Sequence, residues 1–142
     1  MHVLVDTCIW SLALRSNQTI SHEHRDQLSQ LIEENRVKII GSIRQEILSG
    51  IREIPQFQRL KQHLAAFPDL LLQTADYEKA AEFSNIARQQ GIQGSAIDYL
   101  ICAVSHSYQL AIYTTDLDFS NYAKCLPIKI FLGGGNLISC QK

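Results

Sequence analysis

The sequence predicts an α/β fold of three layers, with a central, mainly parallel sheet of four or five strands and helices on both faces. Two observations predict it. Short apolar segments alternate with longer amphipathic segments along the chain, and the apolar residues in the short segments are consecutive rather than alternating with polar ones. Consecutive apolar residues are typical of strands in parallel sheets that are buried on both faces. Because no repeat or linker interrupts this pattern, we expect residues 1–142 to form a single domain.

The first predicted strand is the β-branched run at residues 3–5, which ends at Asp6. Residues 7–14 follow as a short predicted helix. Residues 17–19 have the polar composition of a loop, and a second helix is expected from about Ser21. The apolar side of that second helix would consist of Leu28, Leu31 and Ile32.

The middle of the chain contains two further predicted strands, at residues 37–40 and 70–72. Between them, Ser42 is followed three residues later by Gln45, which is the spacing of a capping box and predicts the start of a helix. Residues 55–66 are expected to form another helix, which ends before Pro68.

The second half of the chain begins with the clearest helix, at residues 75–90, where apolar side chains recur three and four positions apart. Ser95 is expected to begin the next helix. Residues 111–113 and 128–131 are the last two predicted strands, and the three glycines at 133–135 predict the start of a loose tail.

The composition narrows the functional classes. The formal net charge of −1 and the scattered basic residues argue against a protein that binds nucleic acid mainly by neutralising phosphates, but they allow an enzyme that contacts RNA through a bound cation. No basic leader and no run of roughly 20 apolar residues is present, so we expect a cytoplasmic protein without a membrane partner. The cysteines are far apart and the histidines form no ligand pair, so we expect neither a zinc site nor disulfides. The cysteines are Cys8, Cys102, Cys125 and Cys140.

Acidic residues fall at the places where an open parallel sheet carries its functional sites, beyond the carboxyl ends of the strands. Asp6 ends the first strand, and Asp116 and Asp118 follow the strand at 111–113. Two further acids, Glu46 and Asp98, fall in the first turns of predicted helices. Four separate segments are therefore expected to bring carboxylates to one edge of the sheet.

Each acid also has a structural alternative. Asp6 is a favoured helix N-cap residue, and Asp98 follows Ser95 with the spacing of a capping box. Glu46 fits a solvated helix start, and the last two aspartates fit a turn. Taken together, however, converging carboxylates repel one another unless a cation joins them. Oxygen ligands without histidine or cysteine suit Mg²⁺ or Mn²⁺, so the set predicts a site for one of these ions.

Four segments resemble the motifs of PIN domains. Residues 5–7, Val-Asp-Thr, resemble the opening motif, and residues 44–50 resemble the helix that carries the glutamate of the family. Residues 95–103 resemble the central Asp-x-x-Ile-x-Ala helix, and residues 115–119 resemble the last acidic motif. The match covers nearly the whole chain in the order of the family, and it is most similar to the VapC-type toxins of prokaryotic toxin–antitoxin pairs.

The resemblance implies a PIN-like α/β/α sandwich and an endoribonuclease that cuts single-stranded RNA. It also implies a homodimer and a cognate antitoxin protein that keeps the enzyme silent. By motif match, the catalytic and metal-binding core would consist of Asp6, Glu46, Asp98 and Asp116. Asp118 would be a further metal ligand, because either aspartate of the last motif can face the ion. Ser95 would line the site as a hydroxyl donor, although a plain N-cap explains it equally well. Thr7 would support metal-bound water, with a structural hydroxyl as the favoured alternative.

The predicted reaction is hydrolysis of an RNA phosphodiester by metal-activated water. A phosphatase with an aspartyl nucleophile, of the haloacid-dehalogenase type, is one alternative, but Cys8 occupies the position where that chemistry expects a second acid. A non-enzymatic interaction module on the same scaffold is the other, although such a module gains nothing from clustered charge. The candidate phosphate contacts, with ordinary surface arginines as the alternative, are Arg15, Arg44 and Arg52. The candidate partner surface, with core packing as the alternative, comprises Trp10, Leu12 and Leu14.

Overall fold

The computed structural model describes residues 1–14, 22–133 and 137–139. The expectations that lie outside these residues concern the loop at 17–19, Ser21, Arg15, Cys140 and the glycines at 134 and 135. Contacts divide the chain into two compact units, of which the first comprises Met1–Leu4 and Leu72–Lys142 and the second Val5–Leu71. The assignment of residues 1–142 to one domain stays a prediction.

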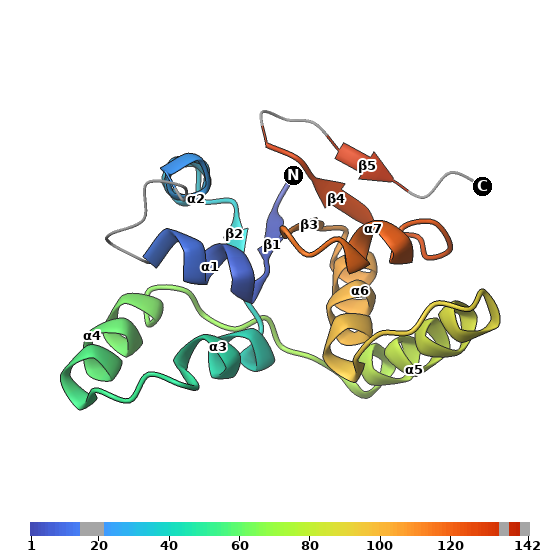
Figure 1. The fold of residues 1–142 in the computed structure, drawn as a ribbon, viewed down its shortest axis with the longest axis horizontal. Coiled ribbons are helices and arrows are strands. Elements are labelled where there is room, and N and C mark those ends of the chain that lie inside the picture. Colours follow the sequence, from blue (N-terminus) through green and yellow to red (C-terminus); the bar gives the residue numbers. More distant parts are fainter. Residues whose placement is uncertain (15–21, 134–136, 140–142) are drawn as a thin grey trace. The chain divides into compact units, whose positions relative to one another are not determined.

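The strands of the first unit lie across the sheet in the order β1 (Val3–Val5), β3 (Ala111–Tyr113), β4 (Lys129–Phe131) and β5 (Leu137–Ser139). The buried runs of β1 and β3 confirm the strands predicted there. Strands β3 and β4 are parallel, as predicted, whereas β4 and β5 are antiparallel (Figure 1). The expectation of a loose tail was therefore wrong for its last part. Three residues after a glycine run are too few to show a strand pattern in the sequence.

The described part of the first unit contains the helices α5 (Thr74–Gln89), α6 (Ala96–Tyr108) and α7 (Asp118–Tyr122). The long helices α5 and α6 pack side by side (Figure 1), and α6 also packs against β3. Helix α5 buries Ala80, Phe83 and Ala87, at the spacing that predicted it. Helix α7 was not predicted, because five residues are too few to repeat the apolar spacing that reveals a helix.

The second unit contains α1 (Thr7–Leu14), α2 (His22–Glu33), β2 (Val37–Lys38), α3 (Gly41–Leu48) and α4 (Ile54–Leu64). These elements confirm the helices predicted in this part of the chain. Helix α1 packs against α2 and α3, and α3 packs against α4. The leucines predicted on the apolar side of α2 are buried, while the isoleucine next to them is 39% exposed.

Two local expectations for the middle of the chain were wrong. Helix α3 begins at Gly41 with Ile40 as its N-cap and has no side-chain cap, so the spacing from Ser42 does not form a capping box. The segment predicted as a strand at 70–72 forms no strand, and the isolated bridge to Ile39 is made by the residue before it, Asp69. For Trp10, core packing is the alternative that the structure supports, because the side chain is 3% exposed and packs edge-on against Phe67 with ring centroids 5.3 Å apart.

Among the described residues, no helix combines the length and the apolar character that crossing a membrane requires.

Candidate metal centre

Three aspartates meet within the first unit. One carboxylate oxygen from each of Asp98, Asp116 and Asp118 lies within 4.8 Å of the other two. Asp98 comes from the first turn of α6, and the other two come from the segment between β3 and the first turn of α7. Asp98 is half-buried and the other two are exposed, so the cluster opens to solvent. The sequence predicted this convergence from the positions of the acids relative to the strands.

At the start of α6, the residue that caps the helix and the residue that supplies a carboxylate to the cluster are different. Ser95 is the N-cap, and its Oγ accepts a hydrogen bond from the backbone N–H of Asp98 at 3.1 Å. The Asp98 carboxylate accepts a hydrogen bond of 2.6 Å from the hydroxyl of Tyr122 through Oδ2. Ser95 therefore has the structural role that the sequence left open, while the Asp98 side chain points to the cluster.

The loop after β3 is held by its own side chains. Thr114 Oγ1 accepts from the N–H of Asp116 at 3.0 Å, and Asp116 Oδ1 accepts from the N–H of Asp118 at 2.9 Å. This second bond is an Asx turn, in which an aspartate caps the backbone two residues on. Asp116 is thus a turn former and a member of the cluster at the same time. Both aspartates of the loop contribute an oxygen, so the structure does not favour one over the other.

Tyr122 is a residue of this site that was not predicted from the sequence. Its side chain is fully buried, and burial raises the pKa of its hydroxyl well above the ordinary value, with the hydrogen bond to Asp98 as the next contribution. The hydroxyl therefore stays protonated and donates to the carboxylate. In the sequence, a tyrosine among apolar residues is expected to be an ordinary core residue. Its hydrogen-bond partner lies 24 positions earlier in the chain, so no local signal revealed this contact.

The donor set fits a hard divalent cation. Three carboxylates supply only oxygen ligands, which Mg²⁺, Mn²⁺ and Ca²⁺ prefer. Two oxygens bound to one ion at about 2.1–2.4 Å lie at most about 4.2–4.8 Å apart, so the separation within the cluster is compatible with a shared ion. Without a cation, three carboxylates this close would repel one another.

The other two predicted acids belong to the second unit. Asp6 Oδ1 accepts from the N–H of Thr7 at 2.8 Å, and Oδ2 accepts from Cys8 Sγ at 3.6 Å. Asp6 is therefore bonded to the first turn of α1, through the N–H of the first helical residue and the thiol of the second. Glu46 is exposed on α3. Their membership of the metal site stays a prediction, whereas the three aspartates of the first unit are brought together.

Thr7 shows one unusual feature. Its Oγ1 is buried and has no hydrogen-bond partner among the described residues, and the same is true of Ser42 Oγ on α3. Buried hydroxyls without a partner are rare in folded proteins, because each loses its hydrogen bonds to water. Both hydroxyls lie in the first turns of helices that follow strands β1 and β2.

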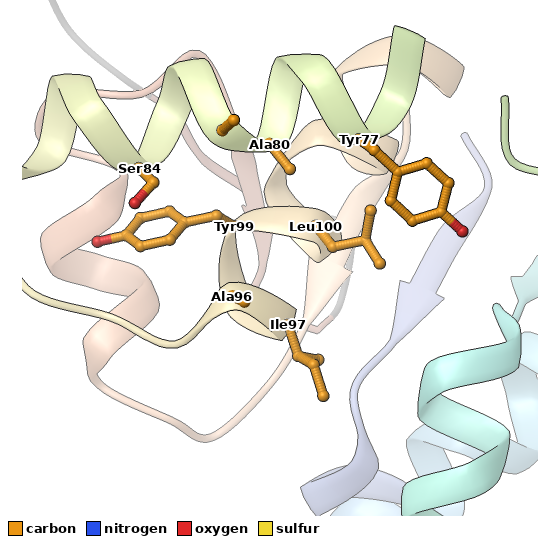
Figure 2. Close-up of a pocket in the computed structure, with 8 residues that line it drawn as sticks. Tyr77, Ala80, Ser84, Ala96, Ile97, Tyr99 and Leu100 are labelled. Carbon is orange, nitrogen blue, oxygen red and sulfur yellow. The ribbon is translucent and has the colours of Figure 1, made fainter. Parts of the chain in front are cut away.

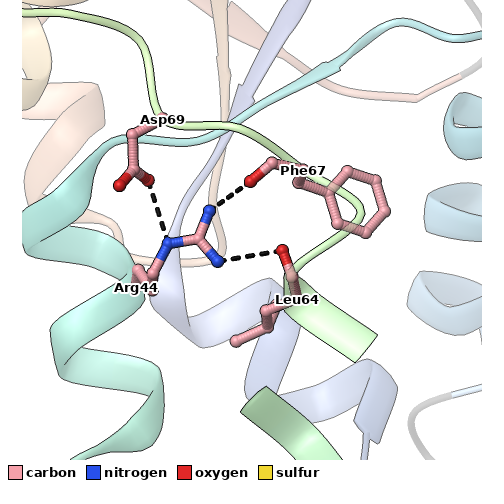
Figure 3. Close-up of polar contacts among 4 residues, drawn as sticks. All are labelled: Arg44, Leu64, Phe67 and Asp69. Carbon is pink, nitrogen blue, oxygen red and sulfur yellow. Dashed lines mark hydrogen bonds and ion pairs between the residues drawn. The ribbon is translucent and has the colours of Figure 1, made fainter. Parts of the chain in front are cut away.

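The hydrogen bonds of Arg44 go to groups of the protein itself (Figure 3). Its Nε donates to Asp69 Oδ1 at 3.0 Å, its Nη1 donates to the carbonyl of Leu64 at 2.9 Å, and its Nη2 donates to the carbonyl of Phe67. These contacts support the structural alternative for Arg44. Arg52, the other described candidate for a phosphate contact, is exposed.

An apolar pocket of the first unit is separate from this cluster. A cavity of about 400 Å³ lies between α5 and α6, where Tyr77 and Ala80 face Ile97 and Leu100 (Figure 2). Since each residue turns a helix by about 100°, the α6 residues of this pocket lie on faces of the helix other than that of Asp98. The pocket is thus no part of the acidic site.

Comparison with known proteins places the fold. The family model described as PIN domain matches residues 3–124. The sequence matches no curated protein. Three similar solved structures cover most of the chain. FitAcB from Neisseria gonorrhoeae is 21% identical, with a TM-score of 0.70, over 84% of this chain and 92% of that chain.

The second, VapBC2 from Rickettsia felis bound to a DNA fragment from their promoter, is 18% identical with a TM-score of 0.70, over 84% of this chain and 92% of that chain. The third, VapBC-1 from nontypeable Haemophilus influenzae, is 12% identical with a TM-score of 0.69, over 89% of this chain and 96% of that chain. At these identities the structures support the predicted α/β/α fold alone. Because the family model covers most of the sequence, the chain belongs to the PIN domain family, and three of the acidic residues of the resemblance, Asp98, Asp116 and Asp118, converge in the first unit.

Proposed function

We propose that this protein is a metal-dependent endoribonuclease that hydrolyses phosphodiester bonds in single-stranded RNA. The observation that carries the proposal is the convergence of Asp98, Asp116 and Asp118 within 4.8 Å in a chain of the PIN family, whose members are generally nucleases. A cluster of three carboxylates is costly for a pure binding scaffold, because the like charges repel. The same cluster is useful to an enzyme that needs Mg²⁺ or Mn²⁺ next to a phosphate.

The roles of the residues follow from their chemistry. When bound, the divalent ion supplies an activated water nucleophile and offsets the negative charge that develops on the phosphate. Asp98, Asp116 and Asp118 hold this ion, and their charge also keeps the site selective for cations. The loop with Asp116 and Asp118 is already fixed by its Asx turn, so these carboxylates lose little freedom on binding.

Asp6 and Glu46 complete the proposed site by their match to the family motifs. Asp6 directly follows β1, and its carboxylate is held by the first turn of α1. By the same match, Thr7 supports the site, and its hydroxyl has no hydrogen-bond partner among the described residues. Ser95 Oγ accepts from the backbone and keeps its own hydrogen for a substrate oxygen.

The proposed biological context is a VapBC-type toxin–antitoxin pair in the cytoplasm, in which this chain is the toxin and forms a homodimer. The support is the fold, since the similar structures include a toxin–antitoxin complex from Klebsiella pneumoniae at 23% identity and a TM-score of 0.57. A cognate antitoxin would be the protein partner and RNA the substrate.

The test is a cleavage assay on one nucleotide sequence in three forms: single-stranded RNA, duplex RNA and single-stranded DNA. We expect cleavage of the single-stranded RNA only, dependent on Mg²⁺ or Mn²⁺ and stopped by EDTA. Asp98→Asn should abolish cleavage while the melting temperature without metal holds or rises, because one repelling charge is removed. The exposed Glu78 on α5 offers a matched control, Glu78→Gln, which should cleave normally. Cleavage that survives EDTA or Asp98→Asn would refute the proposal.

A further inference from the structure

The hydroxyl of Tyr122 makes a short hydrogen bond to a carboxylate of the cluster. Its Oη donates to Asp98 Oδ2 at 2.6 Å. A distance in this range is typical of an O–H donor bonded to a charged carboxylate, and such bonds are stronger than those between neutral groups. The donor comes from α7 and the acceptor from α6, so one hydrogen bond joins the two helices that border the acidic cluster.

The ring that carries this hydroxyl is fixed on several sides. It packs against Tyr99 with centroids 5.2 Å apart and against Phe119 with centroids 5.1 Å apart. The phenol is fully buried, so it has no freedom to turn away from Asp98 without disturbing the core.

Gly94 leaves the space that the hydroxyl occupies. A Cβ atom built on Gly94 would lie 2.2 Å from Tyr122 Oη and 2.7 Å from Cζ, which is closer than packed atoms approach. The backbone of Gly94 is not in the left-handed region, so any residue can adopt its conformation, and the close approach alone explains the glycine. Backbone and side chain together therefore determine where the tyrosine hydroxyl points.

We infer that Tyr122 is a positioning residue that orients the carboxylate of Asp98 for the divalent ion; this inference rests on the proposed function. With one oxygen of Asp98 held by a buried donor, the plane of the carboxylate is fixed before a cation arrives. A cation binds more tightly to a carboxylate that is already fixed, because binding to a mobile carboxylate costs the free energy of ordering that side chain. Tyr122 itself does not touch the metal or the substrate.

The experiment measures Mn²⁺ affinity by calorimetry for the full chain and two variants. Tyr122→Phe keeps the buried ring and removes only the hydroxyl. Tyr99→Phe is the matched control, because Tyr99 is also buried on α6 but its hydroxyl points toward Ser84 (Figure 2). We expect Tyr122→Phe to weaken Mn²⁺ binding by roughly 10-fold to 100-fold, the range for lost partners of metal ligands. Tyr99→Phe should bind Mn²⁺ as the unmodified protein does.

A purely structural role predicts a different result, in which Tyr122→Phe lowers the melting temperature and leaves Mn²⁺ affinity unchanged. That result would overturn the inference but not the proposed function, because Mn²⁺ would still bind. Absence of Mn²⁺ binding in the unmodified protein would overturn both.

A second measurement does not depend on the folding of any variant. The ring signals of Tyr122 are followed by NMR in the unmodified protein as Mg²⁺ is added. They should shift more than those of Tyr77, an exposed tyrosine on α5. Equal or absent shifts at Mg²⁺ saturation would overturn the inference.

Discussion

Arg44 on α3 joins Asp69 through a hydrogen-bonded ion pair of 3.0 Å between Nε and Oδ1. The same guanidinium also donates to the carbonyls of Leu64 and Phe67, so its planar fork ties α3 to the end of α4 and to the segment that follows (Figure 3). Glu46, a predicted member of the active site, lies two residues after Arg44 on the same helix. The contacts of Arg44 therefore help to hold the helix that carries Glu46.

Replacement of Arg44 by alanine should destabilise the protein by about 2–3 kcal/mol, because two carbonyls and a carboxylate lose a charged donor. Arg44→Lys should recover only part of this, since an ammonium cannot reproduce the fork. Urea unfolding measures both, with the exposed Arg52→Ala as a control expected to change stability little. If Arg44 instead contacted phosphate, Arg44→Ala would reduce RNA binding and leave the unfolding curve in place.

Gly94→Ala should destabilise the protein by about 1–3 kcal/mol, because the added Cβ overlaps the phenol of Tyr122 and forces the ring to shift. Gly41→Ala is the matched control. There the new Cβ would meet only Asp69 Oδ2, at an ordinary 3.8 Å, and alanine favours the helix that Gly41 begins. We expect Gly41→Ala to hold or raise stability. Thermal unfolding of the two variants compares them directly, and equal losses would contradict the packing argument.

The sequence predicted the larger features of the fold because they depend on periodic patterns. Helix α5 repeats its apolar positions over four turns, and β1 and β3 are uninterrupted apolar runs. Elements of three to five residues, such as α7 and β5, lack such a repeat, and their positions are determined by tertiary packing. The capping box expected from Ser42 failed because a pattern of two residues is easily met by chance.

The site, too, has residues that could be predicted from the sequence and one that could not. Asp98, Asp116 and Asp118 were predicted from their positions relative to the strands, because chain topology alone brings such positions to one edge of a sheet. Tyr122 was not predicted, since its hydroxyl reaches Asp98 only through the packing of α7 against α6 and the space at Gly94. A contact of this kind has no counterpart in local sequence.

Alkaline pH should destabilise the protein through its buried tyrosines. Burial raises the pKa of Tyr122 and of Tyr99 above the ordinary value of 10.0, and the hydrogen bond to Asp98 adds to the rise for Tyr122. Below about pH 9 both the folded and the unfolded state keep these protons, so the two groups give no slope. Above about pH 10 the unfolded state releases its protons first, and stability falls by up to about 1.4 kcal/mol per pH unit for each tyrosine.

Urea unfolding between about pH 8 and pH 11, with EDTA present, measures this slope. Tyr122→Phe should reduce it, because one of the shifted groups is gone. The exposed Tyr77→Phe serves as the control and should leave the slope unchanged. A slope that is the same in all three proteins would contradict the assignment to buried tyrosines.

Asp116 has two roles in the loop after β3: it forms the Asx turn, and it contributes a carboxylate to the acidic cluster. Two substitutions at this position can test these roles separately. Asp116→Asn keeps a side-chain oxygen that can accept from the N–H of Asp118, at the 2.9 Å bond that forms the turn, but it removes the charge. Asp116→Ala removes both. We expect both variants to lose metal-dependent RNA cleavage, and only the alanine variant to lose stability without metal, by about 0.5–1.5 kcal/mol for one hydrogen bond.

Metal stabilisation provides the second measurement on these variants. A saturating ion that binds only the folded state raises stability by about 2.7 kcal/mol at 100 times its dissociation constant, so Mg²⁺ should raise the melting temperature of the unmodified protein. Asp116→Asn should show little of this increase while its melting temperature in EDTA stays the same or rises, since three clustered charges become two. A full Mg²⁺ response in Asp116→Asn would mean that the ion binds without this carboxylate, and Asp118→Asn would then identify whether its neighbour holds the ion instead.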